Sequence, residues 1–222
     1  MNLNSYIDHT LLKADATWAQ VEKLCAEAKE HEFFSVCINS YFVKRAAAVL
    51  SGSPVKVCTV VGFPLGASTM ETKRFEAMKA LADGAREIDM VLNVSAVKSQ
   101  DWQCALDDMS SLAKVCHQQG GLLKVILETS LLTQEEKTRA CELALKSGVD
   151  FVKTSTGFST GGATVEDVKL MRSIVGDALG VKASGGIRDT ATARKMIDAG
   201  ATRLGTSASV EIIKGLTSAA DY

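Results

Sequence analysis

A lysine stands near the end of a short apolar segment, where a buried ammonium group would be costly. In the stretch VDFVKTSTGFST (residues 149–160), Val149, Phe151 and Lys153 share one face of the expected strand, because strand side chains alternate with a period of two. Lysine avoids full burial unless a partner or a reaction uses it. Lys153 is therefore a candidate reactive amine. The alternative is a lysine that reaches water from the end of a strand.

A second lysine, Lys182, lies in the segment LGVKASGG (residues 179–186). On neighbouring strands the two lysines would stand about 4.8 Å apart, and two adjacent ammonium groups are unfavourable. One of the two amines should then be neutral, and a neutral amine attacks carbonyl carbons. Lys124 is a rival amine in a third apolar segment, but no polar turn resembling TSTG follows it.

A carboxylate, Asp89, lies in the equally apolar segment EIDMVLN (residues 87–93). An unpaired carboxylate is costly in such surroundings. Asp89 is therefore expected to be a structural ion pair with one of the lysines or a proton-transfer group, and the two roles are compatible. Two amines and one acid form a set suited to Schiff-base chemistry.

Other polar residues are expected at strand ends, where they could contact a substrate. They are Asp8 and Thr10 on one face of the first strand, Cys37 on the second, and Thr156 in the TSTG turn. A buried thiol that only fills the core is the alternative for Cys37. The three histidines show no metal-ligand spacing, so no metal site is expected.

Two glycine-rich segments, Ser184-Gly185-Gly186 and Gly205-Thr206-Ser207, follow the last two expected strands. Glycine lets backbone N–H groups approach a phosphate closely, and barrels often bind phosphate in the loops after strands seven and eight. Loops contain glycine for other reasons too. Arg188 is either a further charge contact or a solvated side chain.

These residues depend on an alternation of strands and helices along the whole chain. Strands are predicted at 6–10, 33–39 and 55–63, and within 82–93, 119–129, 146–155, 179–186 and 198–207. Helices are predicted at 18–30, 41–50, 69–81, 102–117, 134–146, 165–175 and 190–199. In several of these units a glycine follows the helix, where a left-handed cap is needed.

Such alternation predicts parallel strands joined by crossover helices, in the α/β class. Two architectures compete, an open doubly wound sheet and a closed (β/α)₈ TIM barrel. Eight units without a linker favour the barrel, as one domain over residues 1–222. The lack of a G-x-G-x-x-G after the first strand weakens the dinucleotide-binding alternative.

The composition restricts the partners and the compartment. Of the 222 residues, 46% are hydrophobic and 23% charged, and the net charge of −1 argues against nucleic acid or a membrane surface as a partner. No signal peptide or membrane span is expected. The six cysteines lack CxxC spacing, which indicates a reduced, cytoplasmic protein without disulfides or a zinc site.

Several motifs together resemble the deoxyribose-phosphate aldolase family. They are YIDHTLL at 6–12, VVGFPLG at 60–66, EIDMVLN at 87–93, KVILET at 124–129, VKTSTGF at 152–158 and VKASGGIR at 181–188. The resemblance covers nearly the whole chain in the same order. It implies a (β/α)₈ class I aldolase that reversibly cleaves 2-deoxy-D-ribose 5-phosphate to acetaldehyde and D-glyceraldehyde 3-phosphate, without metal or organic cofactor.

The resemblance also implies residue roles. Lys153 would be the Schiff-base lysine, Lys182 the lysine that perturbs it, and Asp89 the proton-transfer acid. The phosphate loops would comprise Gly157, Gly185, Gly186, Gly205 and Ser207. Phe158 stands where some members carry a lysine, and no closing role is expected for Tyr222. A homo-oligomer, dimer or tetramer, is expected.

Two rival functions remain compatible with the residues alone. One is a barrel aldolase or isomerase acting on a different sugar phosphate, since the fold hosts many chemistries. The other is a barrel that only binds a ligand, which would form no covalent amine adduct. Substrate exchange in a cleavage assay separates the first from deoxyribose-phosphate cleavage, and borohydride trapping separates the second.

Overall fold

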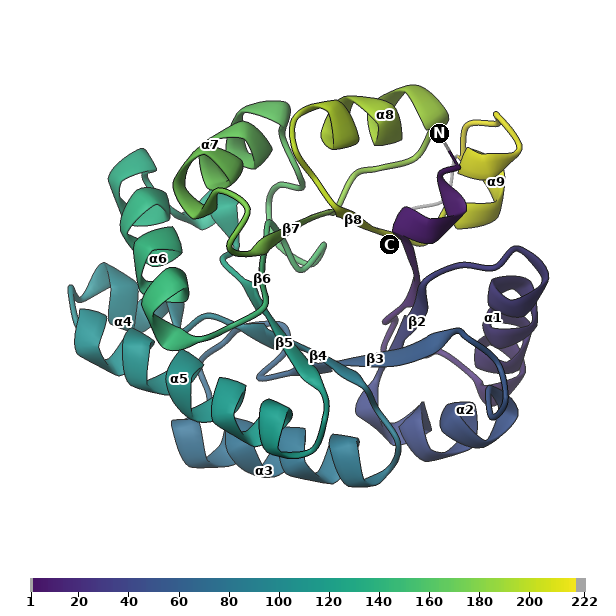
Figure 1. Cartoon of the computed structure of the whole chain (residues 1–222), viewed down its shortest axis with the longest axis horizontal. Coiled ribbons are helices and arrows are strands. Elements are labelled where there is room, and N and C mark those ends of the chain that lie inside the picture. The colour runs from purple at the N-terminus through teal and green to yellow at the C-terminus, as the bar shows by residue number, and fades with distance from the viewer. Residues whose placement is uncertain (1, 219–222) are drawn as a thin grey trace.

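Eight parallel strands form a closed barrel with helices on its outside, in the computed structural model that describes residues 2–218 (Figure 1). The predicted (β/α)₈ architecture is confirmed, and the open sheet is excluded. Each strand pairs with its neighbours in chain order, and β8 closes the ring against β1. The strands are β1 Ile7–Leu11, β2 Ser35–Ile38, β3 Lys56–Val61, β4 Glu87–Val91, β5 Leu122–Ile126, β6 Phe151–Lys153, β7 Gly180–Ser184 and β8 Arg203–Thr206.

Nine helices surround the strands in the part of the chain that the structure describes. They are α1 Trp18–Glu30, α2 Val43–Val49, α3 Met70–Ala82, α4 Val94–Lys98, α5 Trp102–Gln118, α6 Gln134–Ser147, α7 Val165–Val175, α8 Thr190–Asp198 and α9 Ser209–Ile213. None of the helices within residues 2–218 is both long and apolar enough for a membrane span. Tyr222 lies outside the described residues.

Local signals explain most helix boundaries. Thr17 and Thr133 open α1 and α6 with capping boxes, in which the threonine and the N3 side chain satisfy each other's free backbone N–H groups. Gly148 ends α6 in the left-handed conformation, with φ of 80°, as the repeated glycine pattern predicted. Two short helices, α4 and α9, were outside the predicted ranges, because five residues carry too little periodicity to be recognised.

The large hydrophobic core lies between the barrel wall and the helices, and the barrel interior is charged. On β4, Ile88 and Met90 belong to the core, whereas Glu87 and Asp89 alternate with them and meet charged residues of other strands. The same alternation places Lys182 inside, between the core residues Val181 and Ala183. The period of two therefore separates an apolar outer face of the wall from a charged inner face.

Candidate active site

Lys153 ends β6 and lies beside Lys182 of β7 in the strand register. Both side chains are buried. The predicted adjacency of the two lysines is therefore confirmed. Since catalytic groups of these barrels come from the C-terminal ends of strands, Lys153 has the position that a reactive amine requires.

Asp89 joins three lysines at the centre of the barrel. Its Oδ2 atom accepts hydrogen bonds from Nζ of Lys153 and of Lys182, each at 2.8 Å. Its Oδ1 atom accepts from Nζ of Lys124 at 2.7 Å. The ion-pair interpretation of Asp89 is thus confirmed, with three lysines in place of one. Its role in proton transfer remains a prediction.

The charges of this group follow from its contacts. Burial alone would raise the pKa of Asp89, but Lys124, Lys153 and Lys182 outweigh it and hold that pKa well below its ordinary value. Burial would likewise lower the pKa of Lys182, but Asp8 and Asp89 reverse the effect and raise it. At neutral pH, Asp89 is therefore a carboxylate and Lys182 an ammonium group.

Asp8 is the second carboxylate that binds Lys182. Its Oδ2 atom is 2.5 Å from Nζ of Lys182, and its Oδ1 atom accepts from Arg203 and from Ser35, each at 2.7 Å. The Asp8 carboxylate is fully enclosed, and Thr10 turns its hydroxyl to the Asp8 carbonyl. The structure does not bring the side chains of Asp8 and Thr10 to an open surface with Lys153. Asp8 is therefore better placed to position Lys182 than to contact the substrate.

Two charged residues of the barrel interior, Glu87 and Arg203, had no role in the sequence prediction, and Lys124 was considered there only as a rival amine. Lys124 contacts Oε2 of Glu87 at 2.6 Å, and Arg203 contacts the same atom at 3.1 Å. Lys124 is enclosed by Glu87, Asp89 and Cys58, whereas Asp89 is the hydrogen-bond partner shown for Lys153 among the described residues. Lys124 is thus held more tightly than Lys153, which makes it the poorer nucleophile.

The ion-paired network has an odd number of charges. It contains four basic residues and three carboxylates, namely Lys124, Lys153, Lys182 and Arg203 with Asp8, Glu87 and Asp89. One positive charge is therefore in excess when every group is ionised. Because excess charge in a buried network is unfavourable, the loss of one proton from a lysine makes the network neutral.

Two thiols border the acid. Cys58 contacts Oδ1 of Asp89 at 3.2 Å, and Cys37 faces Cys58 in the register of β2 and β3. Cys37 is completely buried, so the predicted substrate contact would need the thiol to become accessible. One potential ligand atom from each of the three residues lies within 4.8 Å of the others. A cation there would face the lysines that already bind Asp89, so these residues do not fit a metal ion.

A hollow of about 350 Å³ brings together Gly157, Gly185 and Gly186, as predicted for a phosphate site. Part of its wall is closely packed backbone, since a Cβ atom on Gly162 would lie 2.3 Å from the carbonyl oxygen of Gly185. Arg188 also lines the hollow. Glycine at these positions lets an anion approach the backbone closely, and Arg188 places a basic residue at the same hollow.

Gly205 does not line this hollow. A Cβ atom at Gly205 would lie 3.0 Å from Cε of Lys182 and 3.0 Å from Cβ of Ser184, so the glycine provides room for the lysine. Ser207 follows β8 with an exposed side chain. The structure thus gives Gly205 a packing reason, and the contacts of Gly205 and Ser207 with phosphate remain predictions.

Two side chains of the loops above the strands complete the site. Thr156 turns its amide and hydroxyl to the buried carboxylate of Glu128, a residue to which the sequence assigned no role. Phe158 lies edge-on to Phe63, with ring centroids 5.2 Å apart. Loops that follow β3 and β6 therefore meet above the barrel.

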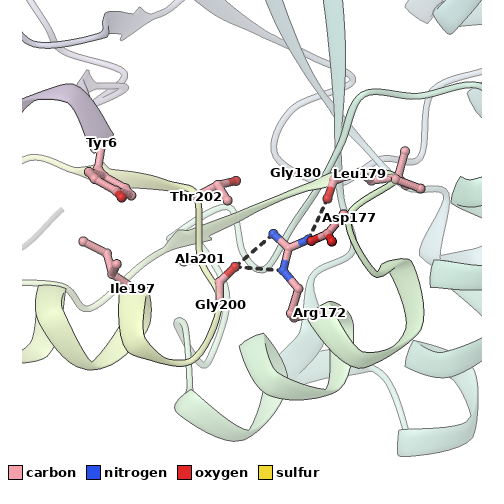
Figure 2. A pocket seen from close by; sticks show the side chains of 10 residues that line it. Tyr6, Arg172, Asp177, Leu179, Gly180, Ile197, Gly200, Ala201 and Thr202 are labelled. Carbon is pink, nitrogen blue, oxygen red and sulfur yellow. Dashed lines mark hydrogen bonds between the residues drawn. The ribbon is translucent and has the colours of Figure 1, made fainter.

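Another hollow, of about 450 Å³, lies at the opposite end of the strands (Figure 2). Arg172 fills one side of it and donates to the carbonyl oxygen of Gly200 at 3.0 and 2.9 Å, and to that of Leu179 at 2.9 Å. Its guanidinium group holds together the loops that precede β7 and β8. That hollow has no lysine or carboxylate of the charged network, which leaves the C-terminal end as the candidate active site.

Comparison with known proteins gives a consistent result. The model of the DeoC/LacD family aldolases matches residues 3–217. The chain is 60% identical over 215 residues to a deoxyribose-phosphate aldolase of Brevibacillus brevis, covering 97% of this chain and 96% of that one. It is 58% identical to the Lactococcus lactis enzyme of the same name, over the full length of both. The tetrameric deoxyribose phosphate aldolase of Aeropyrum pernix has a TM-score of 0.90 and 34% identity, covering 96% of this chain and 89% of that one.

Proposed function

The chain belongs to the DeoC/LacD aldolase family, and from this premise we propose that it reversibly cleaves 2-deoxy-D-ribose 5-phosphate to acetaldehyde and D-glyceraldehyde 3-phosphate. The observation that carries the proposal is the buried amine of Lys153, which lies 2.8 Å from Asp89 and beside the ammonium group of Lys182. A class I aldolase needs a neutral amine next to a group that can move protons.

Lys153 is the proposed nucleophile. Its amine adds to the C1 aldehyde of the open-chain sugar, and the resulting carbinolamine loses water to give a protonated imine. The C2–C3 bond then breaks as the C3 hydroxyl loses its proton. The electron pair of that bond moves through C2 to the imine nitrogen, and D-glyceraldehyde 3-phosphate, formed from C3 to C5, departs. The remaining enamine of acetaldehyde is protonated at carbon and hydrolysed, which releases acetaldehyde and restores Lys153.

Asp89 is the proposed carrier of protons. It would take the proton of the C3 hydroxyl through a water molecule as the C2–C3 bond breaks. Because three lysines hold the pKa of Asp89 low, the proton does not stay on the carboxylate and can pass on to the enamine. Proton transfer by a positioned group contributes about 10²–10⁴-fold to such a reaction.

The charge of Lys182 supports the neutral state of Lys153. An ammonium group beside an amine disfavours a second positive charge, and Asp8 with Asp89 keeps that ammonium group on Lys182. The network is then neutral while Lys153 carries no proton. The substrate phosphate would bind in the hollow lined by Gly157, Gly185 and Gly186.

Borohydride trapping tests this function directly. Purified protein with deoxyribose 5-phosphate should release acetaldehyde, and reduction with borohydride should leave an adduct on the peptide that contains Lys153. The matched control is Lys153→Met, which should show neither. An adduct on Lys182 or Lys124 would overturn the nucleophile. Binding without cleavage or adduct would show a barrel that only holds a ligand.

The compartment and the assembly are further parts of the proposal. All six cysteines are free, which suits the reducing cytoplasm. Tyr41 and Phe75 are 82% and 69% exposed and line one hollow beside α3, which suits contact with further copies of the chain. Light scattering on the wild type and on Phe75→Ser tests this association, and a wild-type monomer would contradict it.

A further inference from the structure

Glu128 is a buried acid at the mouth of the barrel that the mechanism leaves unused. It lies two residues beyond the end of β5, and its side chain is almost fully buried. Its backbone has φ of 57° and ψ of 61°, the left-handed conformation that residues other than glycine seldom adopt. Such a conformation persists only where the surroundings impose it, and functional sites are common places for it.

The Glu128 carboxylate is the final acceptor in a short chain of hydrogen bonds. Its two oxygens accept from the backbone N–H of Thr156 at 3.3 and 3.4 Å, and Oε2 also accepts from the Thr156 hydroxyl. That hydroxyl in turn accepts from the backbone N–H of Phe158 at 3.0 Å. The carboxylate thus fixes three consecutive residues, Thr156, Gly157 and Phe158.

The backbone on both sides of Glu128 is tied to the strand of the nucleophile. The N–H of Leu127 donates to the carbonyl oxygen of Lys153 at 2.9 Å, and the N–H of Thr129 donates to that of Thr154 at 3.0 Å. Glu128 is therefore anchored where β6 ends. Because its position relative to β6 is fixed, its carboxylate can fix the turn that follows Lys153.

This turn forms part of the phosphate hollow. Gly157 lines the hollow opposite Gly185, and a Cβ atom at Gly185 would lie 3.7 Å from Cα of Gly157. A displacement of the turn would change the width of the hollow directly. The amine of Lys153, in contrast, is held through Asp89 and not through Glu128.

We propose that Glu128 is a positioning residue for the substrate phosphate: acting through Thr156, its carboxylate holds the Thr156–Phe158 turn in the conformation that binds the phosphate. The proposal rests on the proposed function, since it assumes a phosphorylated substrate in this hollow. Burial raises the pKa of Glu128 against the opposing hydrogen bonds from Thr156 and the charge of Lys153. A carboxylate retained at such a position is consistent with a specific acceptor role.

The test compares variants that separate the carboxylate from the backbone. Glu128→Gly removes the side chain and adopts a positive φ without strain. Glu128→Gln keeps one oxygen as acceptor for the Thr156 N–H. Thr156→Val removes the hydroxyl while keeping a branched side chain. Glu32→Gly is the matched control, because Glu32 also has a positive φ, of 54°, but is exposed in the connection between α1 and β2.

Three readouts distinguish the possible roles of Glu128. They are KM and kcat for deoxyribose 5-phosphate, the same constants for unphosphorylated 2-deoxyribose, and borohydride trapping of acetaldehyde on Lys153. Glu128→Gly should raise KM for the phosphorylated sugar about tenfold, as expected for lost hydrogen bonds to a charged group. Constants for 2-deoxyribose and trapping of acetaldehyde should change less than about threefold. Glu128→Gln should raise KM for the phosphorylated sugar less than Glu128→Gly does. Thr156→Val should also raise this KM, and Glu32→Gly should match the wild type.

Other results would overturn the proposal. Equal losses for both sugars, or loss of acetaldehyde trapping, would place Glu128 in the chemistry or in support of Lys153. Unchanged KM and kcat in folded Glu128→Gly would show that the Thr156–Phe158 turn keeps its conformation without the Glu128 carboxylate. Wild-type protein that neither cleaves the sugar phosphate nor traps acetaldehyde would instead refute the proposed function. Dissociation constants of inorganic phosphate for wild type and Glu128→Gly, measured by equilibrium binding, test the positioning role without turnover. Equal constants would refute it.

Discussion

Lys153 and Lys182 are register partners on β6 and β7, and both donate to the same oxygen atom of Asp89 at the same distance, 2.8 Å. Among the described residues, Lys182 has a second carboxylate at salt-bridge distance, Asp8, whereas Asp89 is the one shown for Lys153. This asymmetry gives the positive charge to Lys182. It also makes the protonation of the pair sensitive to each charge in the network.

Lys182→Leu should shift the pH dependence of Schiff-base formation. The substitution removes the ammonium group next to Lys153 but keeps an apolar stem, so a proton on Lys153 is favoured by the remaining Asp89. Trapping of acetaldehyde by borohydride should fall at pH 7 and partly recover in alkali, by about tenfold for each pH unit of displacement. Lys44→Leu, on the exposed side of α2, is the control. Superimposed profiles would make Lys182 a bystander, and an equal loss at every pH would indicate a defect of geometry.

Lys124→Met should reduce trapping at neutral pH for a related reason. Without Lys124, three basic residues face three carboxylates, so the network is neutral only when Lys153 is protonated. The double variant Lys124→Met with Glu87→Gln removes one charge of each sign. It should recover trapping at pH 7 relative to the single variant. A double variant that is no better than Lys124→Met, although folded by circular dichroism, would contradict the charge argument.

Gly186→Ala and Gly205→Val should affect different steps. Gly186 has φ of 77° in the phosphate hollow, and an added Cβ strains the backbone without meeting a neighbour within 4 Å. Its substitution should raise KM for deoxyribose 5-phosphate while sparing unphosphorylated deoxyribose. Gly205→Val would press on Cε of Lys182 and should lower activity on both sugars. Steady-state kinetics with the two sugars measures the contrast, and a phosphate-specific loss in Gly205→Val would return Gly205 to the phosphate site.

Asp8→Asn should destabilise the fold in a pH-dependent manner. Burial would raise the pKa of Asp8, but Lys182 and Arg203 outweigh it and lower the pKa below its ordinary value. The stabilisation is therefore present above the unfolded pKa, near about 3.9, and is lost as the pH falls through the folded pKa. We expect a loss of about 3–5 kcal/mol in the free energy of unfolding at pH 7.

Urea unfolding at several pH values measures this difference. The gap between wild type and Asp8→Asn should narrow below about pH 4, because the carboxylate of the unfolded wild-type chain takes up a proton there while the folded one stays ionised. Asp107→Asn, on the exposed face of α5, should change the free energy of unfolding by less than about 0.5 kcal/mol. A gap that is constant from pH 7 to pH 3 would disprove the role of the Asp8 charge.

The sequence was sufficient to predict the barrel and the central pair of lysines. Parallel strands joined by helices place consecutive strands side by side, so Lys153 and Lys182 had to be neighbours once the alternation was recognised. Asp89 could be predicted because a carboxylate within an apolar segment needs a partner. These inferences need only local patterns and the order of the strands.

The other residues of the candidate site could not be predicted, because their positions depend on information that local sequence patterns lack. Arg203 meets Asp8 only because β8 closes against β1, and Glu87 meets Lys124 through the register of β4 and β5. Glu128 has a backbone conformation that its residue type disfavours, so sequence propensity gives no signal for it. Gly205 was assigned to phosphate from its glycine-rich loop, and the room that it leaves for the Lys182 side chain could not be predicted from that pattern.

Acidic and basic residues of the charged network are separated along the chain. The three carboxylates of the network lie on β1 and β4, and the four basic residues lie on β5, β6, β7 and β8. The first half of the barrel is therefore an acidic half-shell and the second half a basic one. Each half-shell repels a copy of itself and attracts the other, so closure of the ring is steered toward the correct partner by the same charges that later hold the reactive amine.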